Sequence, residues 1–527
     1  MRYKRLLLIV SVFIFTLAAW STFVLSAQID PAIFQPNSGF FDINNHNYDI
    51  NGPNLFFPQT DDPVNVEFGS SNAVVTSDDL TVRILSPKHE YKIGRTEYLD
   101  LEGEAFDSHG DLDDADLEWY SDFDGYLGTG PKLSVTGLSV GLHRIELQSR
   151  GLSAFVEVAV LSKAWTILMY MCGDNNLEGN AIQDVNEMEQ IGSDSNVNIV
   201  VMLDRIPGYD SSNGNWSDTR LFYVTKDTNQ STITSQYLGS AGELKMDAPI
   251  SLGAFVKWGI QTYPASKYAV IIWDHGSGWS EKKMKAIRGS CSDYTSGNGE
   301  LEIWEVRQAL RAALDQVGLS KLDLLAYDCC LMGMAEVAYE TRNETKYFVG
   351  SEETEPGDGY EYNRWLSNLA GNPSAAGNTL GQYIVTAYYG TGYATLSAAD
   401  INQMNSLVTA VNGLAQALTA AVPSYKSAIT TARTNTKKFY DVSYLDLYDF
   451  CAKLKSGSLP TTVKNAAGTV QTAISSYIFA KGGNAANAYG VSIWFPATYN
   501  ASMMSSYLNS TEWGADTSWY TFLDTYF

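Results

Sequence analysis

Histidine and cysteine are both scarce in this chain, which limits the metal and disulfide chemistry that it can carry. Each occurs five times in 527 residues, and no two cysteines have the CxxC spacing of a zinc site. An odd number of cysteines leaves at least one thiol without a disulfide partner. The sequence therefore predicts neither a structural zinc site nor a disulfide scaffold, and a free thiol is expected. The cysteines are Cys172, Cys291, Cys329, Cys330 and Cys451.

Basic residues are outnumbered by acidic ones. Lys and Arg number 35 against 59 Asp and Glu, so the formal net charge is −24 at pH 7. A chain of this charge is repelled by nucleic-acid phosphates and by anionic membrane surfaces, so no nucleic-acid partner is expected. The acidic balance is compatible with cationic substrates and also with a role in solubility alone.

Long apolar runs are missing except at the N-terminus. Basic residues at the start of the chain are followed by an apolar stretch from Leu6 to about Ala27, and small residues there offer a cleavage point. This pattern is typical of a secretory signal peptide at 1–27, so we expect an exported protein, either secreted or at the cell surface. The stretch could also span a bilayer if it is not removed. Membrane contact is expected only through this segment, as a retained anchor.

The length of the chain exceeds what one compact core accommodates, so two or more domains are expected. Residues 28–79 are rich in Asn, Asp, Pro and Gly and are interpreted as an irregular linker. Residues 80–161 carry alternating apolar runs about ten residues apart, the pattern of a small antiparallel β-sandwich. This stretch resembles the Ig-like or PKD-like modules of exported hydrolases, with Trp119 as its core aromatic residue. A calcium site and a solvated loop are the two interpretations of the acidic residues Asp111, Asp113 and Asp114.

A different pattern begins near residue 162. Apolar runs without alternation, such as WTILMYMCG, VIIW and LDLLAYD, are interleaved with helix-like stretches over 162–371. Strands of this kind are buried on both faces, so the pattern predicts an α/β fold with a mostly parallel sheet between helices. Residues 372–527 are expected to be mainly helical, with one more strand near Tyr489–Pro496. In such sheets functional side chains lie beyond the carboxyl ends of the strands.

Two of these strands end in reactive side chains. The chain continues after one strand with Asp-His-Gly at 274–276 and after another with Asp-Cys-Cys at 328–330. His275 precedes a glycine turn, a position that favours contact with a substrate over a place in the core. Cys329 is expected to pack against the sheet. Cys330 is expected at the N-terminus of a helix starting near Leu331, where the helix dipole would lower the thiol pKa.

A thiol and an imidazole at adjacent strand ends are the groups needed for acyl transfer through a thioester. The Cys330 thiolate would attack a carbonyl carbon, and the His275 imidazole would protonate the departing amine. The backbone N–H groups of Gly276 and Cys330 are the expected donors to the oxyanion. Loss of one such donor typically raises the barrier by about 3 kcal/mol.

The motifs WTILMYMCGDNNLE, VIIWDHGSGW, LLAYDCCLMGMAEVAYE, SEETEPGDGY and YGVSIWFP resemble, in this order, the clostripain family of cysteine peptidases (peptidase family C11), whose fold is caspase-like. The resemblance runs from about Trp165 to the C-terminus and implies that His275 and Cys330 form a catalytic dyad. It also implies that Asp328 lies at the base of the primary specificity pocket, where a carboxylate selects Arg or Lys before the scissile bond. Asp328 lies two residues before Cys330 and so faces the same side of a strand; the alternative is that it caps the following helix. Cys329 departs from the family, which commonly has alanine there.

The resemblance further implies self-activation by cleavage at a basic residue between the two dyad members. Residues 281–289 are the most basic stretch of this region. An exposed basic loop that is not processed is the alternative. The candidate cleavage residues are Lys282, Lys283, Lys285 and Arg288.

Thioester chemistry needs no cofactor, but some members of the resembled family need calcium. Four acidic residues near the expected strand ends could hold a calcium ion or shape the specificity pocket, and a solvated acidic loop explains them equally well. They are Asp174, Glu352, Glu353 and Glu355.

Together these features predict an exported cysteine endopeptidase whose protein or peptide substrates are cleaved after Arg or Lys. One alternative is a catalytically inactive relative that binds at the cell surface, and the intact His275 and Cys330 disfavour it. The other is a relative with asparaginyl or transpeptidase activity, which Asp328 disfavours.

Overall fold

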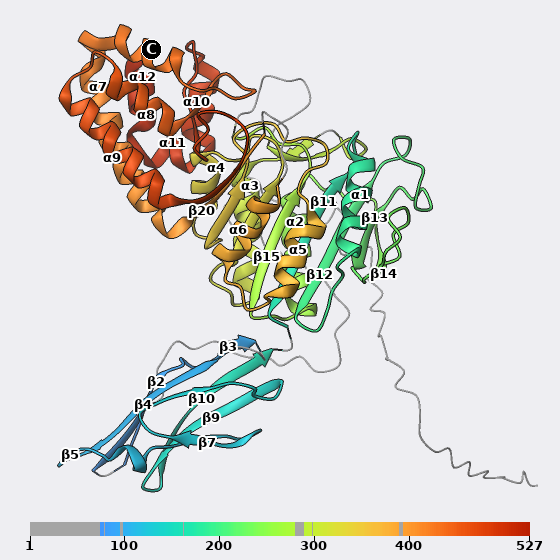
Figure 1. Cartoon of the computed structure of the whole chain (residues 1–527), viewed down its shortest axis with the longest axis vertical. Coiled ribbons are helices and arrows are strands. Elements are labelled where there is room, and N and C mark those ends of the chain that lie inside the picture. The colour runs from blue at the N-terminus through green and yellow to red at the C-terminus, as the bar shows by residue number, and fades with distance from the viewer. Residues whose placement is uncertain are drawn as a thin grey trace, which may run out of the picture.

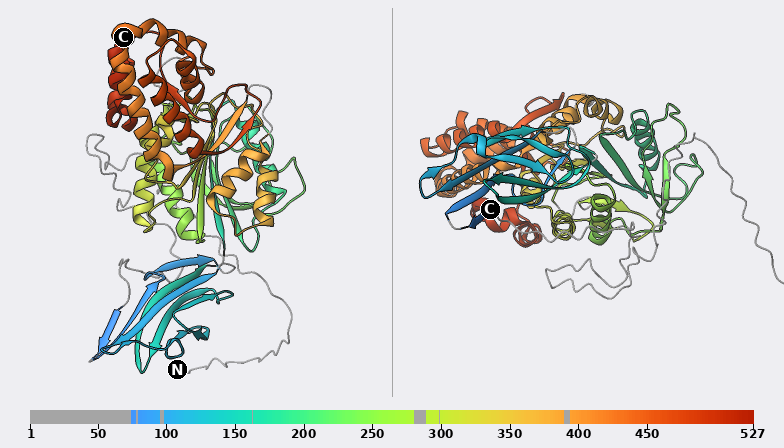
Figure 2. Two further views of the ribbon diagram at one scale, coloured as in Figure 1. Left: turned by 60° about the vertical axis from the view of Figure 1, so that its left-hand side comes forward. Right: turned by 90° about the horizontal axis from the view of Figure 1, so that it is seen from below.

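The computed structural model describes residues 74–77, 79–94, 98–161, 163–279, 289–297, 299–388 and 394–527. The expected signal segment, most of the expected linker and the basic residues Lys282, Lys283, Lys285 and Arg288 lie outside these ranges. The described chain forms a β-sandwich, an α/β domain and a group of C-terminal helices. The sandwich and the C-terminal helices lie at opposite ends of the α/β domain (Figures 1 and 2).

The sandwich consists of two five-stranded sheets that share one apolar core. Trp119 is fully buried in this core, and its Nε1 donates a hydrogen bond to the carbonyl of Gly130 at 2.9 Å. The first sheet contains β1 (Val74–Ser77), β2 (Leu80–Ser86), β4 (Leu99–Asp107), β5 (Gly110–Asp111) and β8 (Lys132–Val135). The second contains β3 (Tyr91–Gly94), β6 (Glu118–Ser121), β7 (Gly125–Thr129), β9 (Gly141–Ser149) and β10 (Leu152–Leu161).

The alternating apolar pattern accounts for the sandwich, because every second side chain of a strand faces the opposite sheet. The inward positions of β10 are Ala154, Val156, Val158 and Val160, all buried. Asp113 and Asp114 are exposed to solvent, which both interpretations of this acidic segment allow. The likeness of this sandwich to Ig-like modules stays a prediction.

The α/β domain is built on one nine-stranded sheet with the order β14-β13-β12-β11-β15-β18-β19-β20-β22. The five strands from β12 to β19 run parallel, and two antiparallel strands extend the sheet at each edge. The expected α/β fold is confirmed, with a mixed sheet. Its strands are β11 (Trp165–Gly173), β12 (Val197–Arg205), β13 (Thr219–Tyr223), β14 (Gln236–Gly242), β15 (Lys267–Trp273), β18 (Leu324–Asp328), β19 (Tyr347–Gly350), β20 (Thr395–Asp400) and β22 (Ile478–Gly483).

Helices cover both faces of this sheet, which explains why its central strands are apolar throughout. In β11, Leu168 and Tyr170 belong to the core on one face, whereas Ile167 and Met169 belong to the core on the other. The first face packs against α2 (Pro249–Thr262) and α3 (Ile303–Gln316). The second packs against α1 (Glu178–Glu189), α5 (Tyr362–Gly371) and α6 (Gly377–Ala387).

The chain beyond residue 372 is mainly helical, as expected, but it also completes the sheet through β20 and β22. The strand expected near Tyr489–Pro496 is present but shorter, and it lies outside the nine-stranded sheet. It is β23 (Ser492–Trp494), which pairs with β21 (Tyr444–Asp446) in a separate two-stranded ribbon. A bridge between Met334 and Ser492 joins this ribbon to the segment that follows Cys330. The C-terminal part is therefore continuous with the domain that carries the expected site.

The C-terminal helices pack around a long central helix, α7 (Met404–Asn435). Among the described helices, only this one is long and apolar enough to meet a criterion of length and composition for a membrane span. It packs against α9 (Thr461–Tyr477) and α12 (Ser518–Tyr526), and Leu407, Leu414 and Leu418 are fully buried. A core helix meets the same criterion, and this burial accounts for the apolar composition. The other helices here are α8 (Leu447–Ser456), α9 (Thr461–Tyr477), α10 (Ala501–Ser510), α11 (Glu512–Asp516) and α12 (Ser518–Tyr526).

Candidate active site

The expected thiol and imidazole follow two adjacent parallel strands, β15 and β18. Trp273 pairs with Asp328 in the register of these strands, so His275 and Cys330 each lie two residues beyond one aligned pair. Gly276 packs directly against the nucleophile segment. A Cβ added to Gly276 would lie 2.3 Å from the carbonyl oxygen of Cys330 and 3.0 Å from its backbone nitrogen. The structure thus brings His275, Gly276 and Cys330 together at one edge of the sheet.

His275 is half-buried and is held by a residue that the sequence did not single out. Its Nε2 lies 3.0 Å from Oδ1 of Asn176, in the loop after β11. An amide oxygen only accepts hydrogen bonds, so Nε2 carries the proton and Nδ1 is left as the basic nitrogen. Burial lowers the pKa of His275 from its ordinary value, which favours the neutral imidazole.

The expected helix at Leu331 is absent, which corrects the predicted environment of Cys330. The helix α4 (Ala335–Glu340) begins four residues later, and Leu331 has φ 65°, a left-handed conformation that ends the strand in a turn. Cys330 is therefore not at a helix N-terminus. Burial raises its pKa, whereas the backbone N–H of Glu355, 3.2 Å from Sγ, lowers it. The net direction is upward, so the resting thiol is neutral, contrary to the expectation from the sequence.

Cys329 packs in the core, as its place next to the strand predicts. It is 1% exposed, and its thiol contacts the carbonyl oxygen of Ile272 at 3.4 Å. Cys330 is the more accessible of the two, and burial holds the pKa of Cys329 well above its ordinary value. Of the adjacent cysteines, Cys330 is thus the candidate nucleophile.

Asp328 is buried directly beside the Cys330 turn and does not cap a helix. The residue before α4 is Met334, so the capping alternative is wrong. One carboxylate oxygen of Asp328 accepts hydrogen bonds from the hydroxyl of Tyr362 at 2.6 Å and from the backbone N–H of Tyr360 at 3.2 Å. Burial raises the pKa of Asp328, and no described ion pair involves this carboxylate. It is a buried acid without a cationic partner among the described residues.

Glu355 adds a second carboxylate to the same place. Both of its carboxylate oxygens are buried, and no hydrogen-bond donor among the described residues reaches them. Burial and then the charge of Asp328 hold the pKa of Glu355 well above its ordinary value. The pKa of the buried Tyr388 hydroxyl is raised chiefly by burial, and the negative charges of Glu355 and Asp328 raise it further. Two acids thus face each other in an apolar, aromatic surrounding.

The other acidic residues considered from the sequence have different places. Glu352 accepts a hydrogen bond from the backbone N–H of Gly490 at 2.8 Å, and Glu353 accepts one from that of Tyr440 at 2.9 Å. Both therefore stabilise the loop after β19. Asp174 lies in a separate cluster with two further carboxylates.

The sequence did not identify Asn176, Tyr360 or Tyr362. The one available signal for Asn176 was its position just after the end of another strand, β11. Tyr360 lies just before α5 and Tyr362 is the first residue of that helix, and only the folded chain brings this segment to Asp328.

The model of the clostripain family matches residues 169–526, which is more than half of the chain. The chain belongs to the clostripain family. It is 28% identical to clostripain of Hathewaya histolytica over 432 residues, which cover 68% of this chain and 80% of clostripain. This clostripain-family chain is accordingly a cysteine peptidase.

Solved structures show the same fold. The secreted C11 cysteine protease from Bacteroides thetaiotaomicron, in complex with an irreversible peptide inhibitor, aligns with a TM-score of 0.51 and 19% identity over 67% of this chain and 98% of that one. An inactive zymogen C11 protease from Parabacteroides distasonis aligns with a TM-score of 0.51 and 19% identity over 69% of this chain and 99% of that one. The clostripain-family fold thus covers the α/β domain and the C-terminal part.

The close approach of Gly276 to Cys330 generates a first prediction. In Gly276→Ala, the new Cβ would push the Cys330 turn away, so kcat/KM for a peptide substrate should fall on the order of 100-fold, as when an oxyanion donor is lost. Gly371→Ala is the matched control, because no neighbouring atom lies within 4 Å of its added Cβ. Equal activity of the two variants at unchanged melting temperatures would contradict the close packing.

The raised pKa of Cys330 generates a second prediction. Only the thiolate reacts with iodoacetamide, so the rate of alkylation at Cys330 should keep rising between about pH 6 and pH 9, without a plateau at low pH. Peptide mass spectrometry would measure the rate at this residue, with Cys330→Ala as the control for other thiols. A plateau reached already near pH 6 would mean a preformed thiolate–imidazolium pair.

Proposed function

We propose that this chain is an exported endopeptidase that cleaves after Arg or Lys, with Cys330 as nucleophile and His275 as general acid–base. The observation that carries the proposal is the aligned end of β15 and β18, since His275 and Cys330 each follow two residues after the Trp273–Asp328 pair and Asp328 is buried there. The N-terminal pattern of a signal peptide at 1–27 supports export. The thioester chemistry itself requires no cofactor.

Cys330 and His275 are both neutral before a substrate binds, so transfer of the thiol proton accompanies the attack of the sulfur on the scissile carbonyl. The proton on Sγ of Cys330 passes to Nδ1 of His275, and the thiolate adds to the scissile carbonyl carbon. The oxyanion is expected to accept hydrogen bonds from the backbone N–H groups of Gly276 and Cys330. The tetrahedral intermediate collapses when the imidazolium protonates the amine, which leaves with the C-terminal product. Water, deprotonated by His275, then hydrolyses the thioester and regenerates the thiol.

Asn176 is proposed to fix the tautomer of His275 that both formation and hydrolysis of the thioester require. Its Oδ1 holds the Nε2 proton, and this fixes the tautomer in which Nδ1 can accept a proton. Asn175, the preceding residue, donates from Nδ2 to Oδ1 of Asp274 at 2.7 Å and to the carbonyl oxygen of Ser292 at 3.0 Å. Both amides of the loop therefore bind the strand end that presents the histidine.

The basic side chain before the scissile bond is proposed to enter between Asp328 and Glu355. Two facing carboxyl groups cannot both ionise in a buried space, which agrees with the upward pKa directions of both. A guanidinium or ammonium group would favour the ionised forms and would meet two acceptors. Tyr360 and Tyr362 supply the donors that hold Asp328 in place. A neutral side chain would leave the buried acids without a counter-charge and bind less well.

A third prediction separates chemistry from specificity. Wild-type protein should cleave fluorogenic peptides with Arg or Lys before the bond and should not cleave those with Asn, Asp or Ala. Cys330→Ala should abolish cleavage. Asp328→Asn and Glu355→Gln should each lower kcat/KM for basic peptides by about 10- to 100-fold, the worth of a charged hydrogen bond, while Asp315→Asn on α3 should change nothing. Cleavage after asparagine, or basic selectivity that survives Asp328→Asn, would overturn the assignment of the pocket.

Self-cleavage within 281–289 is proposed to accompany activation. These residues connect the imidazole segment to β16 (Ser290–Asp293), and the two sides of the connection meet where the backbone N–H of Ser277 bonds to the carbonyl of Gly289 at 3.0 Å. Ser290, which follows the basic stretch, forms a β-bridge with Gly276, the residue after His275. A zymogen form is known for the Parabacteroides distasonis relative.

A fourth prediction follows for the intact mass of the purified chain. Wild type should separate into two fragments with a new N-terminus after Lys282, Lys283, Lys285 or Arg288, while Cys330→Ala stays whole. Adding wild type to the variant would show whether one molecule can cut another. Intact wild type, or the same nick in both proteins, would contradict self-cleavage.

A further inference from the structure

The amide that holds His275 has a second partner. Oδ1 of Asn176 lies 3.0 Å from Nε2 of His275 and 3.1 Å from the hydroxyl of Tyr294. Tyr294 is the residue directly after β16, far along the chain from the loop after β11 that carries the amide. The same oxygen therefore accepts one hydrogen bond from the imidazole and one from a phenol.

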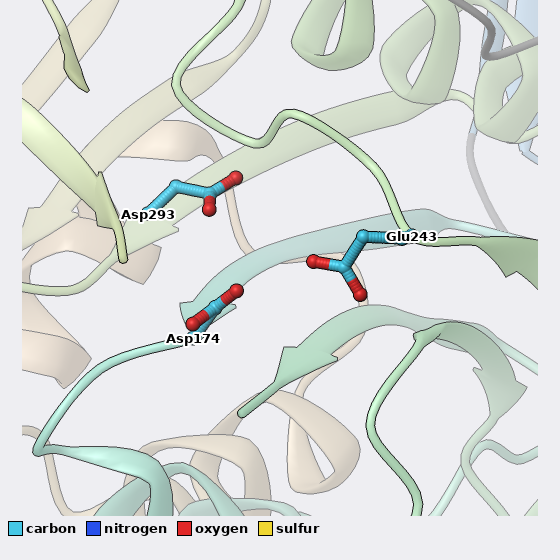
Figure 3. A group of neighbouring side chains, drawn as sticks. All are labelled: Asp174, Glu243 and Asp293. Atoms are coloured by element: carbon cyan, nitrogen blue, oxygen red, sulfur yellow. The ribbon is translucent and has the colours of Figure 1, made fainter. Parts of the chain in front are cut away.

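Tyr294 binds the loop after β11 at two points. Its backbone N–H donates to the carbonyl oxygen of Asp174 at 3.0 Å, and its hydroxyl bonds to Asn176, two residues further on. Figure 3 shows the side chains of Asp174 and Asp293 turned toward one common space with Glu243, and one carboxylate oxygen from each lies within 4.8 Å of the others. The segment around Tyr294 thus lies alongside the loop that carries Asn176.

The strand β16 is itself attached to both strand ends of the site, so the position of the Tyr294 ring is well defined. Ser290 forms a β-bridge with Gly276, after β15. The carbonyl oxygen of Ser292 accepts a hydrogen bond at 3.0 Å from Nδ2 of Asn175, after β11. Tyr294 therefore reaches Asn176 from a backbone that the site already holds in place.

The Tyr294 hydroxyl acts as a donor. Burial raises its pKa from the ordinary value, so the phenol keeps its proton at neutral pH. Among the residues that the structure describes, Oδ1 of Asn176 is its hydrogen-bond acceptor. An amide has an oxygen and an NH2 group of nearly equal size, and its partners decide which of them faces a neighbour. If the NH2 group of Asn176 faced the ring, Nε2 of His275 would have to accept, the proton would lie on Nδ1, and the proposed base would be lost.

We propose that Tyr294 is a positioning residue for His275 and acts through Asn176. Its hydroxyl keeps the amide oxygen turned toward the ring, so Nε2 stays protonated and Nδ1 is left to accept the proton of Cys330. Tyr294 itself touches none of the reacting atoms. Its effect on catalysis rests on the proposed function, but its effect on the tautomer of His275 does not.

The position of Tyr294 in the chain gives this hydrogen bond a further consequence. His275 precedes the stretch 281–289 and Tyr294 follows it. A cut within that stretch would leave Asn176 and His275 on the first fragment and Tyr294 on the second. The imidazole would then keep its orientation only while β16 stays bound to the strand ends of the first fragment.

The kinetic test removes the hydroxyl in two backgrounds of the full chain. In the wild-type background, Tyr294→Phe should lower kcat for a basic peptide by about 10-fold and leave KM nearly unchanged, because the tyrosine does not touch the substrate. In Asn176→Asp, both carboxylate oxygens accept and no amide needs to be oriented, so Tyr294→Phe should cost less than about 2-fold. A packing role for the ring would cost the same in both backgrounds. Tyr209→Phe is the matched control, an exposed neighbouring tyrosine whose change should leave kcat as in wild type.

A spectroscopic test needs no activity. Nitrogen NMR of Cys330→Ala made with isotope-labelled histidine should show His275 with its proton on Nε2, and adding Tyr294→Phe should populate the form with the proton on Nδ1. The signal of His275 is the one that His275→Ala removes.

The inference is overturned if the proton is already on Nδ1 in Cys330→Ala, if Tyr294→Phe leaves the tautomer unchanged, or if the kinetic loss is equal in both Asn176 backgrounds. A chain that cleaves no peptide but whose tautomer responds to Tyr294→Phe would refute the proposed function alone. An active chain whose tautomer ignores Tyr294→Phe would refute the positioning role alone.

Discussion

The pairing of β15 with β18 is the constraint on which the rest of the site depends. Because the strands are parallel and Trp273 is aligned with Asp328, the chain leaves both strands at one level, and the next two residues on each side present an imidazole and a thiol. Because both faces of the sheet are buried, this register is strongly specified. A slip of one residue would move every core side chain to the opposite face of the sheet. The glycine after His275 lets the two strand ends touch.

Burial also sets the charge state of the groups that this register brings together. It lowers the pKa of His275 and raises those of Cys330, Asp328 and Glu355, so each group is pushed toward its neutral form before a substrate arrives. Under the proposed function, a cationic side chain would restore the charges of the pocket, and the reacting carbonyl would receive the thiolate only as its proton moves to the imidazole. In this proposal, the specificity for basic side chains and the reactivity of the thiol both depend on burial of the charged groups, and a cationic substrate offsets its energetic cost.

Sequence patterns predicted the parts of this molecule that are local or uniformly buried. Continuous apolar runs located β11, β15 and β18, and the motifs at the ends of β15 and β18 located the imidazole and the thiol. The edge strands β20 and β22 escaped notice because they are short or carry polar residues on one face. The helix expected at Leu331 was wrong because a left-handed residue interrupts it. Glu355 was noticed only as one of several acids, since its approach to Asp328 depends on a loop fold that no local pattern encodes.

The most direct measurement is the labelling of the wild-type chain by a peptide ending in an arginine acyloxymethyl ketone, with mass spectrometry to identify the modified residue. An adduct confined to Cys330, formed much more slowly in His275→Ala and Asp328→Asn than in wild type, is the result that this account predicts. An adduct on another cysteine would contradict it. So would labelling of Cys330 at the same rate in all three proteins, because the thiol, the imidazole and the buried carboxylate would then not act on one substrate.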